Sequence, residues 1–189
     1  PLASRGARGK PIINLLPLEE GERISAVLPI REFTEDAFVF MATSNGTVKK
    51  SPLKMFSRPR SNGIIAISLK DDDLIDVAIT DGNNEVLLVA NNGKAIKFDE
   101  ADVRPTGRTA SGVRGIRLKS DYRVIALCIV NDGLLLTATE NGYGKRTKIE
   151  EFSTQKRGGQ GVIAIKTSDR NGLTVGALQV SEDDEIMLI

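Results

Sequence analysis

The residues best able to do chemistry in this chain are lysines and arginines that recur at the same phase of a repeating pattern. Three groups follow successive Asn-Gly pairs: Lys49, Lys50, Arg58 and Arg60; Lys94, Lys97, Arg104 and Arg108; and Lys145, Arg146, Lys148, Lys156 and Arg157. Acidic residues instead gather in turns, at 71–73 and 182–185. Cations in phase with a repeat fall on one edge of the fold, so they can follow a phosphate backbone although the net charge is only +1. The pattern therefore predicts a basic edge that contacts phosphates.

Other kinds of chemistry find little support in the composition. The chain has no His and one Cys, Cys128, which lies in an apolar run where a buried, inert thiol is expected. Zinc-type sites and His-dependent triads are therefore excluded, and no carboxylate pair, phosphate loop or nucleophile constellation stands out. With no recognition helix and few aromatic residues, we expect sequence-tolerant contact with a duplex rather than base reading or stacking on single strands.

The elements that must position the cations are short strands. Asn-Gly occurs at 45–46, 92–93 and 141–142, each time between apolar or alternating runs, which is typical of a β-hairpin with a two-residue turn. The pairs lie 47 and 49 residues apart. A unit of about fifty residues is the size of one four-stranded propeller blade.

Two further patterns keep the same period. A glycine-led strand recurs at 63–67, 112–116 and 161–165. A second strand begins at Ile24, Leu74, Val124 and Thr174, and its third position is small in three of the four copies. Helical turns are expected only near 53–56 and 150–152. The sequence therefore predicts one all-β, propeller-like domain with repeats at 1–43 (incomplete), 44–90, 91–139 and 140–189. We interpret it as a fragment of a larger ring, in which exchanged strands could complete a fourth blade.

One loop of the last repeat combines charge with glycine. Its residues are Gln155, Lys156, Arg157, Gly158, Gly159, Gln160 and Gly161. Glycine lets a backbone approach a ligand and present N–H groups to phosphate oxygens. The loop resembles the gyrase A box, Gln-Arg-Arg-Gly-Gly-Lys-Gly, and segments 5–18, 40–50, 112–118 and 141–147 resemble the C-terminal domain of the bacterial DNA gyrase A protein. Lys156 and Gln160 depart from the motif, so the loop is either the box or a degenerate echo of it.

The resemblance covers essentially the whole chain and implies a β-pinwheel, a propeller-like ring of about four four-stranded blades here, with strands exchanged between neighbours. It implies duplex DNA wrapped around the basic outer edge, in support of ATP-dependent negative supercoiling by a type II topoisomerase.

The resemblance also places the domain within a larger enzyme. The nucleophilic Tyr, ATP and Mg would belong to other parts of the enzyme, so no cofactor and no catalysis are expected in this fragment. The implied partners are the rest of the gyrase A protein and the gyrase B protein, in the bacterial cytoplasm with the nucleoid and without a membrane. The alternatives are the pinwheel of the corresponding topoisomerase IV protein, or a protein-interaction platform whose binding would be insensitive to salt.

Overall fold

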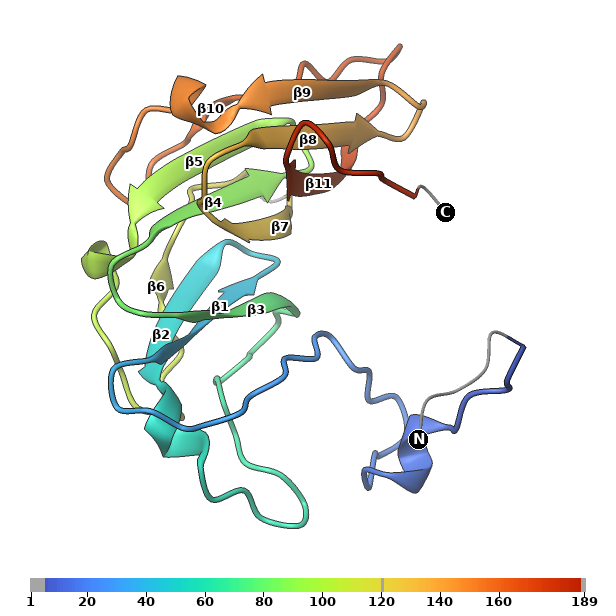
Figure 1. Ribbon diagram of the computed structural model, residues 1–189. Coiled ribbons are helices and arrows are strands. Elements are labelled where there is room, and N and C mark those ends of the chain that lie inside the picture. The colour runs from blue at the N-terminus through green and yellow to red at the C-terminus, as the bar shows by residue number, and fades with distance from the viewer. Residues whose placement is uncertain (1–5, 120, 188–189) are drawn as a thin grey trace.

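The computed structural model describes residues 6–119 and 121–187. It contains three antiparallel sheets that follow one another in a curved row (Figure 1). In order across the first sheet are β3 (Leu74–Thr80), β1 (Phe38–Thr43), β2 (Thr47–Pro52) and β6 (Val113–Arg114). Across the second are β10 (Val162–Ile163), β5 (Lys94–Asp99), β4 (Glu85–Ala90) and β7 (Val124–Ile129). Across the third are β11 (Thr174–Val180), β8 (Leu134–Thr139) and β9 (Gly144–Lys148).

The helical segments are single 3₁₀ turns that join these strands. They are η1 (Ile12–Asn14), η2 (Leu53–Phe56), η3 (Glu100–Asp102) and η4 (Ile149–Glu151). The two turns expected from the sequence correspond to η2 and η4. No helix within the described residues is long and apolar enough to cross a membrane. The all-β, pinwheel-like fold predicted from the sequence is confirmed.

The three Asn-Gly pairs do join hairpin strands, but the connections are longer than the predicted two-residue turns. A two-residue type I′ turn needs positive φ at both central residues, and no described residue other than glycine has positive φ. The glycines alone do so, with φ of 86° at Gly46, 77° at Gly93 and 79° at Gly142. Each glycine N–H donates to the carbonyl three residues earlier at 3.0 Å. The turn therefore keeps its asparagine in an ordinary conformation and uses only the glycine to reverse the chain.

Strand exchange between repeats is also confirmed. β6 follows β5 in the chain yet pairs with β2 of the first sheet, and β10 follows β9 yet pairs with β5 of the second. The remaining glycine-led copy, at 63–67, forms no strand in the structure. Its partner would be a hairpin preceding β1, and the described residues before β1 form no such hairpin.

In the incomplete first repeat, predicted at 1–43, residues 6–37 likewise contain no strand, and β1 at 38–43 is the one strand among its described residues. The segment beginning at Ile24 is the counterpart, one repeat earlier, of β3, and β3 pairs with β1 of the hairpin that precedes it in the chain. The expectation of about four four-stranded blades is therefore corrected for the described residues: two sheets have four strands and one has three.

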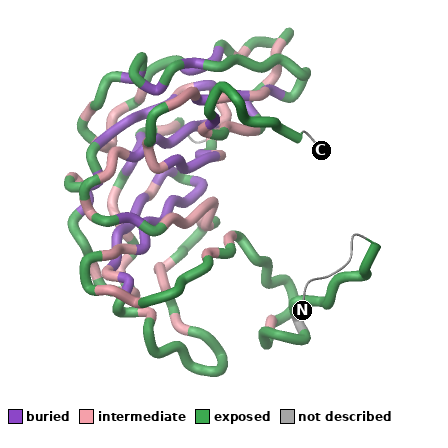
Figure 2. The backbone as a smooth tube through the Cα atoms, in the orientation of Figure 1, coloured by how far each residue is buried: buried purple, intermediate pink, exposed green. Residues whose placement is uncertain are grey.

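The core lies between the sheets and is largely aliphatic. Leu88 packs toward Phe40 of the first sheet, whereas its neighbour Leu87 packs toward Leu135 of the third, as the two-residue period of a strand requires. Figure 2 shows this buried interior within the row and exposed loops around it. Cys128 is buried in the second core, and this burial raises the pKa of its thiol to about 11, as expected for an inert cysteine.

Candidate nucleic-acid interface

The convex edge of the row is built from connections that lie against the preceding sheet. The connection after β5 meets β2 through a parallel bridge between Pro105 and Lys50, and the connection after β9 meets β5 through one between Thr154 and Lys97. In Figure 1 these connections follow the outer side, while β3, β7 and β11 lie toward the open side. At these two connections the outer edge therefore combines residues of two repeats.

The structure divides the thirteen predicted cations into three classes. Seven are exposed: Arg58, Arg60, Arg104, Lys145, Arg146, Lys148 and Lys156. Three are half-buried: Lys94, Arg108 and Arg157. Three are buried: Lys49, Lys50 and Lys97. The predicted basic edge is thus partly an exposed surface and partly an internal set of contacts.

The buried lysines are engaged inside the fold. Nζ of Lys49 donates to the carbonyl of Ala66 at 2.6 Å and to that of Arg108. Burial lowers the pKa of Lys49, and the nearby charge of Arg108 lowers it further. Nζ of Lys97 lies 3.2 Å from the carboxylate of Glu85. A phosphate would have to displace these partners, so we leave the buried lysines out of the exposed basic surface.

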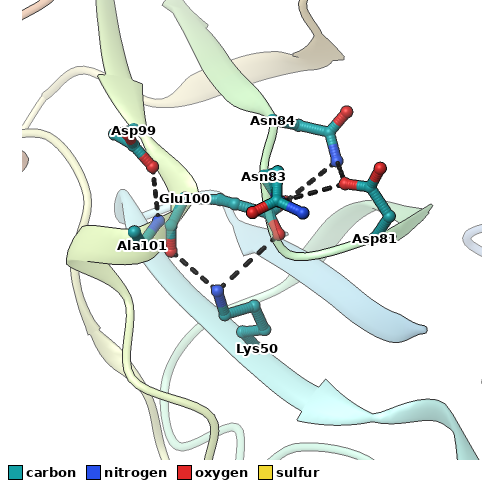
Figure 3. A network of polar contacts seen from close by, with 7 residues as sticks. All are labelled: Lys50, Asp81, Asn83, Asn84, Asp99, Glu100 and Ala101. Carbon is teal, nitrogen blue, oxygen red and sulfur yellow. Dashed lines mark hydrogen bonds and ion pairs between the residues drawn. The ribbon is translucent and has the colours of Figure 1, made fainter. Parts of the chain in front are cut away.

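Lys50 makes both a hydrogen bond and an ion pair with one buried residue, Glu100 (Figure 3). Its Nζ donates to the backbone carbonyl of Glu100 at 2.9 Å and lies 3.7 Å from the carboxylate of the same residue. The side chains of Lys50 and Glu100 are 4% and 0% exposed. Asn84 approaches the other carboxylate oxygen at 3.5 Å and is held by Asp81 at 2.7 Å. Since Glu100 opens η3 of the next repeat, Lys50 joins the first sheet to the second.

Arg146 occupies the same register position but remains exposed. It pairs across its hairpin with Leu136, as Lys50 pairs with Phe40 and Lys97 with Leu87. Cross-strand partners share a face of the sheet, so the three cations lie on equivalent faces. In the described part of the chain no strand pairs with the outer side of β9. Exposure at this position therefore depends on whether another repeat covers it.

The box-like loop is anchored to the preceding repeat. The N–H of Gln155 donates to the Lys97 carbonyl at 2.8 Å, and that of Gly158 donates to Gly115 at 2.5 Å. The guanidinium of Arg157 donates to the carbonyls of Asp102 and Arg114 at 2.8 and 3.0 Å. These contacts use two of its five N–H donors. Backbone hydrogen bonds to the preceding repeat hold the loop in place, and the remaining N–H donors of Arg157 are left for a ligand.

Two further cations lie on these connections, Arg108 and Lys156. Arg108 donates to the Ile65 carbonyl at 3.4 Å, as Arg157 does one repeat later to the residue in the equivalent position. The side chain of Lys156 is 90% exposed and contacts Asp102 at 3.0 Å. An exposed pair of this kind contributes little to stability. Lys156 is therefore presented to solvent from a fixed loop.

Among the exposed cations that sequence reasoning missed are Arg114, Arg117 and Lys119. Arg114 lies on β6, and the other two follow it before β7. The signal was present, because Arg114 replaces the isoleucine found at this position in the copies at 63–67 and 161–165. The exchanged strand β6 pairs with β2 of the preceding hairpin, so the basic positions extend beyond the hairpin and its following loop.

Comparison with known proteins agrees with this geometry. The family model described as "DNA gyrase C-terminal domain, beta-propeller" matches residues 1–31, 37–81, 84–131 and 133–181. The chain is 57% identical to the DNA gyrase A protein of Salmonella typhimurium and 54% identical to that of Escherichia coli. Both comparisons cover 100% of this chain but only 22% of the relative's length.

Solved structures give the same result. The C-terminal domain of DNA topoisomerase IV superposes with a TM-score of 0.85 at 33% identity, covering 92% of this chain and 55% of that one. The DNA gyrase A C-terminal domain gives 0.83 at 31%, covering 94% and 60%. The similarity to the gyrase family inferred from the sequence is confirmed: this chain belongs to the DNA gyrase C-terminal domain family of β-propellers.

Proposed function

We propose that this chain is a non-catalytic domain that binds duplex DNA, largely independently of sequence, along its convex outer edge. The observation that carries the proposal is the recurrence of exposed cations on three successive connections: Arg58 and Arg60 on the first, Arg104 on the second and Lys156 on the third. Regular spacing along a curved edge suits a ligand of regular negative charge.

Physical chemistry supplies the mechanism. Each phosphate neutralised by a lysine or arginine releases condensed counterions, which favours binding and makes it depend steeply on salt. A duplex that follows a convex edge must bend, and the additional phosphate contacts along the edge offset the bending energy. The half-buried Arg108 and Arg157 add donors that are already oriented by their carbonyl contacts.

In the longer protein, we propose that this wrapping supports ATP-dependent negative supercoiling by DNA gyrase. The names of the sequence relatives support the gyrase A protein as the parent. Its partner in this proposal is the gyrase B protein. ATP, Mg and the nucleophilic tyrosine would then belong to other regions, and the complex would act on the nucleoid in the bacterial cytoplasm. The box-like loop would hold one segment of the wrap.

The test is duplex binding by the chain over a range of salt concentrations. Arg58→Ala/Arg60→Ala and Lys156→Ala/Arg157→Ala should each reduce the slope of log affinity against log salt by about 0.9 for every phosphate that is no longer neutralised. Lys70→Ala/Arg170→Ala is the control, because it also removes two exposed cations but from turns beside the hairpin tips. Since Arg170 donates to the hydroxyl of Tyr143 at 2.9 Å, the thermal unfolding of this variant is compared with that of the unchanged chain. Equal slopes for all three variants, or binding that ignores salt, would refute DNA contact by the outer edge and favour a protein-interaction platform.

A further inference from the structure

A cation-lined hollow lies beside the tip of the β4–β5 hairpin. It has a volume of about 360 Å³ and is lined by Lys94, Arg117 and Lys119, with polar groups from Asn92, Tyr122 and Gln160. Only Lys94 and Gln160 belong to the sites expected from the sequence. The hollow brings together a hairpin tip and the segment after β6 from one repeat and the end of the box-like loop from the next.

The charge of this hollow sets it apart from the other two hairpin tips. At the first tip, the carboxylate of Asp72 accepts from Ser44 and Asn45 at 2.8 and 2.9 Å. At the third, Glu140 accepts from the backbone of Leu173 at 2.8 Å. Tyr122 occupies the position that Asp72 has in the first repeat, since each lies two residues before the start of the equivalent strand. The middle tip has thus replaced a carboxylate by an uncharged phenol.

The three cations of the hollow have no acidic partner among the residues that line it. Asp121, the carboxylate next to Tyr122 in sequence, does not line the hollow and has an interaction of its own. By contrast, Lys97 and Lys156 on neighbouring segments are each paired with a carboxylate. Like charges gathered in a concave site repel one another and concentrate anions. The arrangement therefore favours an anionic ligand.

The walls of the hollow are fixed by the backbone. Arg117 donates its N–H to the carbonyl of Gly159 at 2.7 Å, which ties this wall to the box-like loop. Thr167 donates its hydroxyl to the carbonyl of Asn92 at 3.2 Å, and the side chain of Asn92 accepts from the N–H of Lys94 at 3.1 Å. A site with fixed walls loses little entropy when it binds a ligand.

We propose that this hollow is a discrete phosphate-binding seat that takes the phosphodiester backbone of DNA held on the outer edge. The proposal rests on the proposed function. Arg117 supplies a planar fork of donors suited to two phosphate oxygens, and Lys94 and Lys119 supply mobile point charges. Because Gln160 and Gly159 belong to the box-like loop, the seat lies directly beside the basic edge. It lets one strand of the bound duplex turn toward the hairpin-tip side of the second sheet.

The experiment compares Arg117→Gln/Lys119→Gln with Arg58→Ala/Arg60→Ala and with the control Lys70→Ala/Arg170→Ala in the whole chain. Removing two phosphate contacts should reduce the salt slope by about 1.8 and the affinity by roughly 60-fold at about 0.1 M salt. Hydroxyl-radical footprinting at single-nucleotide resolution should show that protection disappears at one position for the hollow variant and over a longer stretch for the edge variant. The substituted side chains are exposed, so matching thermal unfolding should accompany every variant.

The outcomes separate this proposal from the general one. If the edge variant loses DNA affinity while the hollow variant behaves like the control, the proposed function stands and the phosphate seat is refuted. If the hollow variant alone loses affinity and its local footprint, binding along the edge is refuted, and with it the proposal that the hollow takes the backbone of DNA held on that edge. Titration with pyrophosphate, followed by NMR, distinguishes the source of the phosphate. Pyrophosphate binding at the hollow without any effect of the hollow variant on DNA would overturn the assignment to a DNA backbone.

Discussion

Replacing Lys50 by methionine should separate a structural lysine from a DNA-binding one. Lys50 and Glu100 are almost completely buried, and the ammonium group is the only cation in a described ion pair with this carboxylate. Removing one member of a buried pair leaves an uncompensated charge and costs about 3–5 kcal/mol. With a urea m-value of about 2 kcal/mol/M, the unfolding midpoint of Lys50→Met should fall by about 1.5–2.5 M.

The double variant Lys50→Met/Glu100→Met tests the cause of that loss. It removes both charges and fills a similar volume, so most of the stability should return. Lys145→Met is the surface control. Its side chain is exposed, and its free energy of unfolding should change by no more than about 0.5 kcal/mol.

DNA binding provides the opposing measurement. Under conditions in which both proteins remain folded, Lys50→Met should leave the salt slope of duplex binding unchanged, because its ammonium group faces Glu100 and not solvent. If the urea midpoint of Lys50→Met equals that of the unchanged chain and its salt slope is reduced by about 0.9, the reasoning is refuted and Lys50 is a phosphate ligand.

Two further predictions concern exchanged strands and acid stability. Gly161→Ala should lower the free energy of unfolding in urea far more than Gly142→Ala. Both glycines have positive φ, 69° and 79°, which costs an alanine about 1–2 kcal/mol, but only at Gly161 would the added Cβ meet backbone, 2.4 Å from the Ala95 oxygen. Equal losses of unfolding free energy in the two variants would contradict this geometry. The Thr154 hydroxyl and, to a smaller degree, Lys97 lower the pKa of Glu85 below 4.5, so its stabilising effect is complete above that value and is lost as the pH falls through the lower folded value. Thr154→Val should therefore narrow the difference between urea midpoints at about pH 6 and about pH 3, and an unchanged difference would exclude the hydroxyl as the cause.

Periodicity in the sequence was sufficient for the repeated all-β organisation, and the resemblance to the gyrase family supplied the expectation of strand exchange. Glycine-led segments at 112–116 and 161–165 recur with a fixed spacing, and both place a short strand on the preceding sheet. The copy at 63–67 has the same pattern without forming a strand. A strand needs a partner for its backbone donors and acceptors, and this partner lies in another repeat. The number of complete blades therefore could not be read from the repeat count alone.

The turn type was mispredicted because it depends on contacts with residues distant in sequence. Asn-Gly favours a two-residue turn when both residues adopt positive φ, but in the first hairpin the N–H of Asn45 is held by the carboxylate of Asp72, and its side chain donates to the carbonyl of Asp71. These contacts come from a turn 26 and 27 residues away in sequence. Tertiary contacts thus accompany a conformation that the dipeptide alone does not favour.

Whether a predicted cation is buried or exposed also depends on contacts that the repeat pattern does not reveal. Lys50, Lys97 and Arg146 share a register position, and sequence phase alone gives them one role. Lys50 is buried against Glu100 of the next repeat, Lys97 is buried beside Glu85 of its own hairpin, and Arg146 is exposed. A long cationic side chain has an apolar stem and a charged end, so it suits either a buried junction or a phosphate surface. Recurrence therefore identifies positions that meet a neighbouring group, and the structure decides whether that group is a carboxylate within the fold or remains to be supplied by a ligand.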